Sequence, residues 1–396
     1  MQFEISINFI EDPGKMVAFL SAFEHQHAVK IDLQVFDWPS AWAELMKISL
    51  YGHGPILSET GSTWMSSLAG QNCLRPFKSN EVSATGGANN FLPEAWQSCI
   101  DFDNQTVLAI PWTLNTYLAY YRRDLLAQAG VDEASAFTSL ENFVSALERL
   151  QKIGVEVPLA IPTAGNSVSA LHNASSFIWK MGGELIKPDG KQVLFSKPNT
   201  LAGFKQYFEL QRFMTQAARG LDDEACVHAY MEGRAAITFR SPDLLTMIKN
   251  GKTPDQVSRN TAMAIQPGIP FVGGSNLVIW KHVQPTQEAL ALELVRYLTS
   301  TGNMLTLFHD LGIIPANLEA LDQVDHDPAY LPVTQSLRSG RAMQRVPLWG
   351  LVEDRLVKAL DHIWQVIFAT PDPNVSQIIV NTLLPLEERL NITLSQ

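Results

Sequence analysis

Cysteine is scarce in this sequence: Cys73, Cys99 and Cys226 are the only three in 396 residues. They form no CxxC pair, and an odd number of cysteines cannot all pair within one chain. The nine histidines include no HExxH sequence and no Cys/His set with the spacing of a zinc site. We therefore expect buried free thiols, with one disulfide as the alternative, and neither a metal site nor a cofactor.

Charged residues are also few, at 17% of the chain, and the net charge is −11. Binding to nucleic acid needs clustered Lys and Arg that displace counterions from phosphates, and the sequence has no such cluster. The acidic balance also argues against docking on an anionic membrane surface. Low charge together with nine Trp instead favours neutral, ring-shaped ligands.

Long apolar runs and catalytic motifs are missing as well. No uninterrupted apolar stretch reaches about 18 residues, so we expect no membrane-spanning helix. No GxSxG elbow, phosphate-binding loop or dinucleotide fingerprint occurs. We interpret the acidic runs at 222–224 and 387–388 as solvated faces rather than as the paired carboxylates of a glycosidase. The sequence therefore predicts no enzymatic activity.

The length of the chain and its apolar pattern predict a two-domain α/β protein. At 396 residues the chain exceeds what one compact core holds. Apolar residues alternate over residues 3–9 and 29–35, which indicates strands, and a short third strand is expected at 55–57. Helices connect these strands, and Asp12 is the expected N-cap of the first one. This βαβαβ order predicts a parallel sheet with helices on its faces.

The rest of the chain keeps the α/β character. Thr138 and Glu141, three residues apart, predict a capping box at the start of a helix. The last stretch, 350–394, is predicted to form two helices separated by Pro371 and Pro373. Further strands are expected at residues 107–111, 118–121, 158–161 and 235–239, and a further helix at 201–211.

Four candidate binding residues directly follow predicted strands, where ligands of α/β sheets lie. They are Glu11, Trp38, Asn166 and Arg240. Glu11 could instead belong to a helix cap, and Arg240 could pair with a carboxylate rather than with vicinal hydroxyls. Aromatic rings with a few fixed polar groups suit a sugar, whose C–H faces and hydroxyls need both.

Several motifs occur in a recognisable order along nearly the whole chain. They are Gly-Ser-Thr-Trp at 61–64, Ala-Ile-Pro-Trp at 109–112, Tyr-Tyr-Arg-Arg-Asp-Leu-Leu at 120–126, Gly-Arg-Ala-Ala-Ile at 233–237, Gly-Gly-Ser at 273–275 and Gly-Ile-Ile-Pro at 312–315. Taken together, they resemble extracellular solute-binding protein family 1. This is the group of sugar-binding proteins of ABC importers to which maltodextrin-binding proteins belong.

The resemblance implies an α/β fold of the type II periplasmic-binding-protein class, with two lobes joined by a hinge of several crossing segments. It places the N-lobe at residues 1–111 plus 265–315. It places the C-lobe, with the C-terminal helices, at residues 112–264 plus 316–396. It further implies a monomer that captures a sugar or oligosaccharide in the cleft between the lobes and closes on it.

The resemblance also implies a role and a location for the protein. The solute would be delivered to the membrane permease subunits of an ABC importer, in the periplasm or at the cell surface. The chain as given shows no signal peptide, because alternating strand residues follow Met1 without a basic and apolar leader. A cytoplasmic location and a ligand-sensing role in a regulatory system therefore stay open as alternatives to transport.

Seven further site residues are implied by the resemblance. Trp64 is a solute platform with the core as its alternative, Gly274 is a point of close backbone approach or a bare turn, and Trp349 is the late aromatic platform. By contrast, Trp280 and Trp364 lie within apolar patterns, so we expect them in the core. The seven residues are Ser62, Trp64, Trp112, Asn115, Gly274, Ser275 and Trp349.

Overall fold

The computed structural model of the chain describes residues 2–8, 12–251 and 253–395. The chain divides into two compact units. Unit 1 comprises residues 1–115, 272–327 and 345–350, and unit 2 comprises residues 116–271, 328–344 and 351–396. The lobes inferred from the resemblance differ from these units in four places. Residues 112–115, 316–327 and 345–350, which the resemblance assigns to the C-lobe, lie in unit 1, and residues 265–271, which it assigns to the N-lobe, lie in unit 2.

Unit 1 is built on a five-stranded mixed sheet. The strands lie in the order β2-β1-β3-β9-β4. β1 pairs in parallel with β2 and β3, which confirms the predicted βαβαβ unit, and β9 runs antiparallel between β3 and β4. A strand from far along the sequence therefore occupies an inner position of this sheet. The strands are β1 (Gln2–Asn8), β2 (Lys30–Phe36), β3 (Leu57–Gly61), β9 (Gly273–Ile279) and β4 (Ile110–Asn115).

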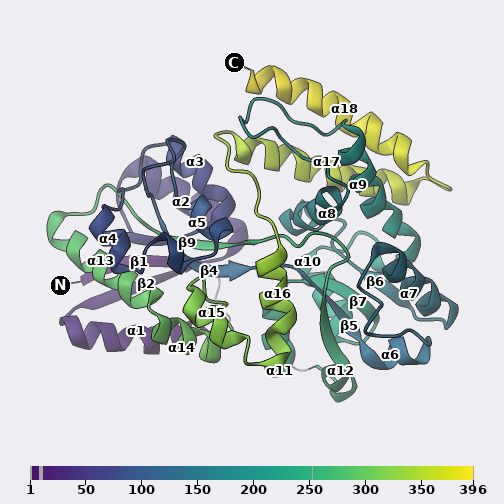
Figure 1. Cartoon of the computed structure of the whole chain (residues 1–396), viewed down its shortest axis with the longest axis horizontal. Coiled ribbons are helices and arrows are strands. Elements are labelled where there is room, and N and C mark those ends of the chain that lie inside the picture. Colours follow the sequence, from purple (N-terminus) through teal and green to yellow (C-terminus); the bar gives the residue numbers. More distant parts are fainter. Residues whose placement is uncertain (1, 9–11, 252, 396) are drawn as a thin grey trace. The chain divides into compact units, whose positions relative to one another are not determined.

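Helices cover both faces of the unit 1 sheet. Figure 1 shows α1 on one side of β1 and β2 and α2 on the other. The Asp12 carboxylate accepts the Lys15 N–H at 3.3 Å, which confirms the predicted cap of α1. A core cluster that includes Leu45, Leu68 and Trp280 fills the α2 side. The helices are α1 (Pro13–His27), α2 (Trp38–Tyr51), α3 (Met65–Gly70), α4 (Ser79–Ala84), α5 (Pro93–Ser98), α13 (Pro285–Thr299), α14 (Thr301–Leu311) and α15 (Leu318–Val324).

Unit 2 has a four-stranded sheet in the order β6-β7-β5-β8. β6 and β7 are parallel, whereas β5 runs antiparallel to both β7 and β8. The strands are β6 (Val157–Ala160), β7 (Ala235–Arg240), β5 (Leu118–Arg122) and β8 (Thr261–Ile265).

The C-terminal helices complete unit 2. α18 packs on α9, and the Trp364 ring of α17 meets the Phe208 ring of α9 at 4.7 Å between centroids. Burial of Trp280 and Trp364 confirms that both are core residues. The helices are α6 (Arg123–Gln128), α7 (Leu140–Lys152), α8 (Val168–Lys180), α9 (Pro198–Phe208), α10 (Asp223–Met231), α11 (Asp243–Asn250), α12 (Asp255–Asn260), α16 (Leu331–Ser339), α17 (Trp349–Ala369, which begins in unit 1) and α18 (Val375–Leu394).

Three local predictions need correction. The N-cap of α7 is Ser139, whose hydroxyl accepts the Asn142 N–H at 3.1 Å, and the Thr138 hydroxyl donates instead to the Ser135 carbonyl. β3 starts where the predicted third strand ends, and β4 lies three residues later than predicted. The break between α17 and α18 is confirmed, but Pro385 lies inside α18.

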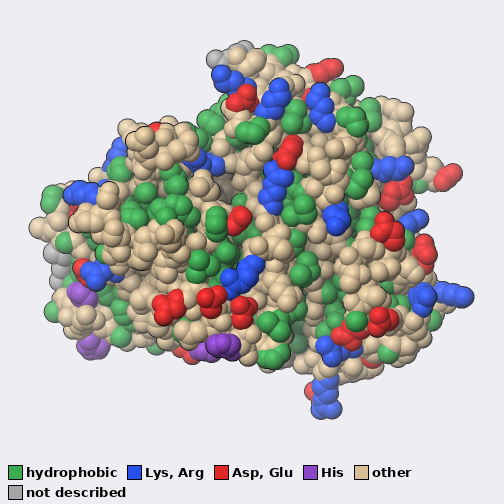
Figure 2. Space-filling view, viewed as in Figure 1, with side chains coloured by type: hydrophobic (Ala, Val, Ile, Leu, Met, Phe, Trp, Pro, Cys, Tyr) green, Lys and Arg blue, Asp and Glu red, His purple; other side chains and the backbone are tan. Residues whose placement is uncertain are grey.

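The cysteines, the helices and the surface charges were each compared with what the composition predicts. All three cysteines are free, and Cys99 and Cys226 are buried, which confirms the prediction for these two, whereas Cys73 is half-buried. Within the described ranges, no helix is long and apolar enough to cross a membrane, and no group of three or more His, Cys, Asp or Glu is placed to hold a metal ion. On the face drawn in Figure 2, Lys and Arg side chains are scattered among acidic and uncharged ones.

Candidate functional site

Three tryptophans gather in unit 1 where β2 and β3 end; we call Trp38, Trp42 and Trp64 the tryptophan cluster. Trp38 is the first residue of α2 and follows β2 almost directly, and Trp64 lies in the short 3₁₀ helix after β3. The Trp64 ring centroid lies 5.4 Å from that of Trp38 and 5.7 Å from that of Trp42. Trp38 is 42% exposed, whereas Trp42 and Trp64 pack partly against the core.

Gly61 lets these rings approach the backbone. A Cβ at this position would lie 3.3 Å from the Trp64 ring and 3.5 Å from the Trp38 ring. The tryptophan cluster therefore packs against the core through Trp42 and Trp64, and Trp38 is its most exposed member. The Trp64 ring packs partly against the core, which is the alternative considered for it, and it also contacts the exposed Trp38 ring.

Four more of the expected residues lie at the same end of the unit 1 sheet. Ser62 follows β3, Ser275 pairs with Gly61, and Gly274 and Asn115 lie on the neighbouring strands β9 and β4. Because β9 is antiparallel, its first residues meet the last residues of β3 and β4. At Gly274, where φ is +139°, a Cβ would lie 2.0 Å from the Thr113 carbonyl oxygen, so this close approach requires glycine.

A buried carboxylate, which no sequence pattern indicates, lies in the same region. Glu59 is 6% exposed, and its side chain accepts the Asn8 N–H at 2.6 Å. Burial raises the pKa of Glu59, although hydrogen bonds from the Ser275 hydroxyl and the Asn8 N–H act in the opposite direction. The Ser275 hydroxyl also lies 2.7 Å from that of Thr113. These contacts join β1, β3, β9 and β4 at one end of the sheet.

In unit 2, Arg240 lies at the end of β7 and faces two carboxylates. Its guanidinium lies 2.8 Å from Asp243 and 3.8 Å from Asp223. Of the two roles considered for Arg240, the structure shows pairing with carboxylates. Asp223 also accepts hydrogen bonds from the hydroxyls of Ser167 and Ser169 at the start of α8.

The acidic run at 222–224 is only partly the solvated face that we expected. Asp222 and Glu224 are exposed, but Asp223 is half-buried and bonded as described above. The sequence pattern could not separate Asp223 from its neighbours, because all three residues are acidic and open a helix. What distinguishes Asp223 is its position opposite Ser167 and Arg240, which are remote in sequence.

An aromatic stack lies beside this group in unit 2. The His172 and Phe271 rings are parallel to within 7° with centroids 3.8 Å apart, and Tyr117 packs against both. Burial lowers the pKa of His172 to about 3, so its imidazole is neutral at physiological pH. Next to His172, the buried Asn173 side chain accepts a hydrogen bond from Gln266 at 2.9 Å. None of these residues was singled out from the sequence.

Four candidate residues remain. Asn166 is exposed, with a φ of 51°, in the loop that leads to α8. Trp112 and Trp349 are each 1% exposed, so a solute reaches either ring only if the surrounding residues move. Glu11 lies outside the described residues.

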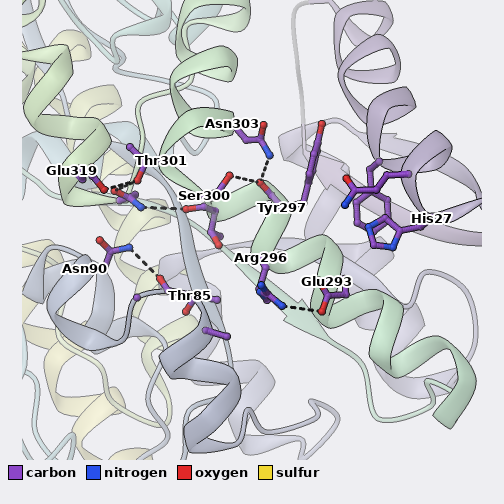
Figure 3. Close-up of a pocket in the computed structure, with 16 residues that line it drawn as sticks. His27, Thr85, Asn90, Glu293, Arg296, Tyr297, Ser300, Thr301, Asn303 and Glu319 are labelled. Atoms are coloured by element: carbon purple, nitrogen blue, oxygen red, sulfur yellow. Dashed lines mark hydrogen bonds and ion pairs between the residues drawn. The ribbon is translucent and has the colours of Figure 1, made fainter.

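A cavity of about 480 Å³ lies in unit 1, and none of the ten candidate residues that the structure describes lines it. Figure 3 draws the residues around it. Its walls come from α1, α13, α14, α15 and the loop after α4. The polar side chains there bond to one another: Arg296 to Glu293 at 2.9 Å, Thr301 to Glu319 at 2.9 Å, and Asn90 to the Thr85 carbonyl at 3.1 Å. This recess therefore offers few groups for a solute, and we assign the candidate site to the strand ends.

Comparisons with known proteins identify the family of the chain and its fold. A sequence model of the bacterial extracellular solute-binding protein family matches residues 18–332. No curated protein matches the sequence. Among solved structures, the sugar-binding protein MalE from Xanthomonas citri is 17% identical with a TM-score of 0.81, and the match covers 100% of this chain and 98% of that one.

Two further structures resemble the chain over its whole length. An ABC transporter solute-binding protein from Thermotoga lettingae, bound to α-D-tagatose, is 16% identical with a TM-score of 0.83, and 99% of each chain is covered. An ABC substrate-binding protein from Listeria monocytogenes, in complex with cycloalternan, is 14% identical with a TM-score of 0.81, covering 99% of this chain and 98% of that one. These matches establish the two-sheet periplasmic-binding-protein fold.

Proposed function

Since the chain belongs to the bacterial extracellular solute-binding protein family, which serves ABC transporters, we propose that its solute is a neutral sugar or short oligosaccharide. The family is one of binding proteins rather than enzymes, which confirms the expectation drawn from the missing catalytic motifs. Both the kind of solute and the residues that contact it are our inference.

The tryptophan cluster is the observation that carries this proposal. Sugar rings have apolar C–H faces that stack on flat aromatic surfaces. Trp38 offers such a surface, because it is 42% exposed and its neighbour Trp64 supports it at 5.4 Å between centroids. Ser62, at the same end of the sheet, supplies a hydroxyl that can bond to those of a sugar, and the buried Ser275 lies beside it on β9.

The polar groups of unit 2 also suit a neutral solute. Asp223 and Asp243 carry carboxylate oxygens that accept hydrogen bonds from sugar hydroxyls, and Arg240 is a donor. An anionic solute is disfavoured there, because the guanidinium already faces two carboxylates. The structural relatives support the same solute class: MalE is described as sugar-binding, and the other two were solved with a sugar and an oligosaccharide.

We include the remaining candidate residues in the proposal with different roles. Asn115 and Gly274 shape the unit 1 site, Asn166 belongs to unit 2, and Glu11 follows β1. Trp112 and Trp349, which are buried here, would contact the solute only after a conformational change.

Closure and delivery are part of the same proposal and come from the family. One solute would be held by both units, which close on it, and the loaded protein would dock on the permease subunits of an ABC importer outside the cytoplasm. Small-angle scattering with and without a bound sugar tests closure, because a closed form has a smaller radius of gyration. Superimposable profiles would contradict it.

A thermal-shift screen tests the solute class. The panel contains maltose, maltotriose and D-tagatose, with a polyamine and amino acids as charged controls. A sugar that binds only the folded protein stabilises it by about 2.7 kcal/mol at a hundredfold excess over Kd. We expect a shift with at least one sugar and none with the charged solutes. A shift with a charged solute alone would overturn the proposed solute class.

A pair of tryptophan variants tests the site. Trp38→Ala removes the exposed ring and should weaken binding of the sugar at least about tenfold. Trp96→Ala is the matched control, because Trp96 is a half-buried tryptophan of unit 1 that stacks on Phe91 outside the tryptophan cluster. We expect Trp96→Ala to leave the Kd unchanged. Equal Kd values for both variants and the unmodified protein would exclude Trp38 as a solute contact.

A further inference from the structure

Glu59 is a buried acid at the end of the unit 1 sheet where we place the solute site. The parallel pairing of β1 with β3 includes Ile5 and Ser6, and the Glu59 carboxylate then binds the N–H of Asn8. No ion pair among the described residues involves Glu59, and its hydrogen-bond partners, Asn8 and Ser275, are uncharged. An acid buried without a cation is costly, so its retention at this position calls for a reason.

A chain of two hydrogen bonds links Glu59 to Thr113 through Ser275. When Glu59 is ionised, its carboxylate can only accept hydrogen bonds, so the Ser275 hydroxyl then donates its proton to Glu59. The Ser275 oxygen is then free to accept a proton, and the Thr113 hydroxyl, 2.7 Å away, can supply it. With its proton donated to Ser275, the Thr113 hydroxyl can only accept a further hydrogen bond and cannot donate one.

Thr113 is well placed to use that oxygen. Its side chain is half-buried, and Thr113 follows Trp112 on β4, two residues before Asn115. The register of β4 against β9 shifts between Pro111 and Thr113. Irregularities of this kind re-aim side chains and are common beside binding sites. Ser275 lies opposite Gly61, the residue against which the tryptophan cluster packs.

We propose that ionised Glu59 is a positioning residue for the solute site, which fixes Thr113, through Ser275, as a hydrogen-bond acceptor for a solute hydroxyl. This inference rests on the proposed function. It adds the direction of one hydrogen bond to that function: the solute group at Thr113 donates the bond, and Thr113 accepts it. A solute with an acceptor-only group at that position, such as an ether oxygen or fluorine, is excluded.

Protonation of Glu59 reverses this hydrogen-bond order. A neutral carboxyl can donate to Ser275, Ser275 then donates to Thr113, and the Thr113 proton turns towards the solute. Since burial raises the pKa of Glu59, the reversal occurs above the usual carboxyl value of about 4.3. The neighbours that bond Glu59, Asn8 from β1 and Ser275 from β9, do not titrate in this range, so they add no second step.

Affinity measured against pH tests the inference. The probe is whichever of maltose, maltotriose and D-tagatose binds the unmodified protein most tightly. We expect its Kd to rise about tenfold as the pH falls from about 8 to about 4.5. Glu59→Gln keeps an acceptor for the Asn8 N–H but lets its amide donate to Ser275. This variant should therefore show the weaker affinity at every pH.

A second variant avoids the buried acid. Thr113→Val has nearly the same shape, removes the acceptor and should also weaken binding about tenfold, with no dependence on pH. The double variant should bind no more weakly than either single one, because both act on the same contact. Glu24→Gln is the matched control: Glu24 of unit 1 likewise accepts a backbone N–H, from Ile31 at 2.7 Å, away from the strand ends. It should keep the wild-type profile.

The outcomes separate this inference from the proposed function. If the unmodified protein binds a sugar but Thr113→Val keeps its affinity and pH profile, the inference is wrong and the proposed function stands. The same holds if Glu59→Gln is folded by circular dichroism and retains the pH-dependent step. If no sugar of the panel binds the unmodified protein, the proposed function fails and the inference fails with it.

Discussion

His172 is a histidine held neutral by its surroundings, stacked on Phe271 in unit 2. Burial lowers its pKa to about 3, whereas in the unfolded chain it titrates near 6.5. As the pH falls below about 6.5, protons bind the unfolded chain first, so the stability contributed by the neutral imidazole is lost. We expect His172 to lower the free energy of unfolding by about 2 kcal/mol between pH 7 and pH 5.

Urea unfolding at the two pH values measures this effect. His172→Phe keeps an aromatic ring against Phe271 and removes the titration, so its stability should fall less between pH 7 and pH 5 by about that amount. His309→Phe serves as the control, because His309 is exposed on α14 and its replacement should leave the wild-type pH dependence. An unchanged slope in His172→Phe would show that His172 is accessible to protons in the folded chain.

Helices α8 and α9 approach each other closely at a glycine. A Cβ at Gly203 of α9 would lie 2.3 Å from the Cα of Ile178 in α8. Gly203→Ala must therefore separate the two helices, and we expect it to lower the free energy of unfolding by about 3 kcal/mol. Chemical unfolding monitored by circular dichroism measures the change.

Gly302 provides the matched control at the start of α14. No heavy atom lies within 4 Å of a Cβ built there. Gly302→Ala should stabilise the protein by roughly 0.5 kcal/mol, because alanine restricts the unfolded chain more than glycine does. If both substitutions had the same effect, the close contact of α8 with α9 would not explain the requirement at Gly203.

The elements that could be predicted from the sequence are those with a strong local pattern. Alternating apolar residues predict β1 and β2, and Asp12 followed by Pro13 predicts the start of α1. The structure confirms all three elements. The position of β9 inside the sheet depends on pairing across the chain, which alternation cannot report.

Polar residues with long-range partners were harder to interpret for the same reason. Glu387, part of an acidic run predicted to be solvated, is instead buried in α18, where its carboxylate accepts hydrogen bonds from the N–H and the hydroxyl of Ser196 at 2.6 and 2.8 Å. Glu59 was missed in the same way, since only folding brings it to Asn8 and Ser275. Trp38 was predictable as a candidate because its signal, a Trp directly after a strand, is local.

Because unit 1 is assembled from separate segments of the chain, its first segment should not fold by itself. Residues 1–115 contain four strands of the unit 1 sheet but lack β9, which pairs with both β3 and β4. A fragment of residues 1–115 should therefore fail to show a cooperative thermal transition. Asn115 pairs directly with Gly273, so a short Gly-Ser turn can join residues 1–115 to 272–327.

We expect the joined fragment to recover a cooperative transition by circular dichroism, because it contains all five strands. A cooperative transition in residues 1–115 alone would show that β9 is dispensable for the fold of unit 1. Failure of the joined fragment would instead show that segments outside these ranges are needed.

The late arrival of β9 also has a consequence for synthesis. A ribosome adds about 5 to 20 residues per second, so roughly 10 to 30 s separate the emergence of β4 from that of β9. During this interval the nascent chain carries β3 and β4 with unpaired edges, which bind other chains readily. The sheet of unit 1 thus stays incomplete while residues 116–272 are synthesised, and that is the period in which a chaperone or an export machinery would find it unfolded.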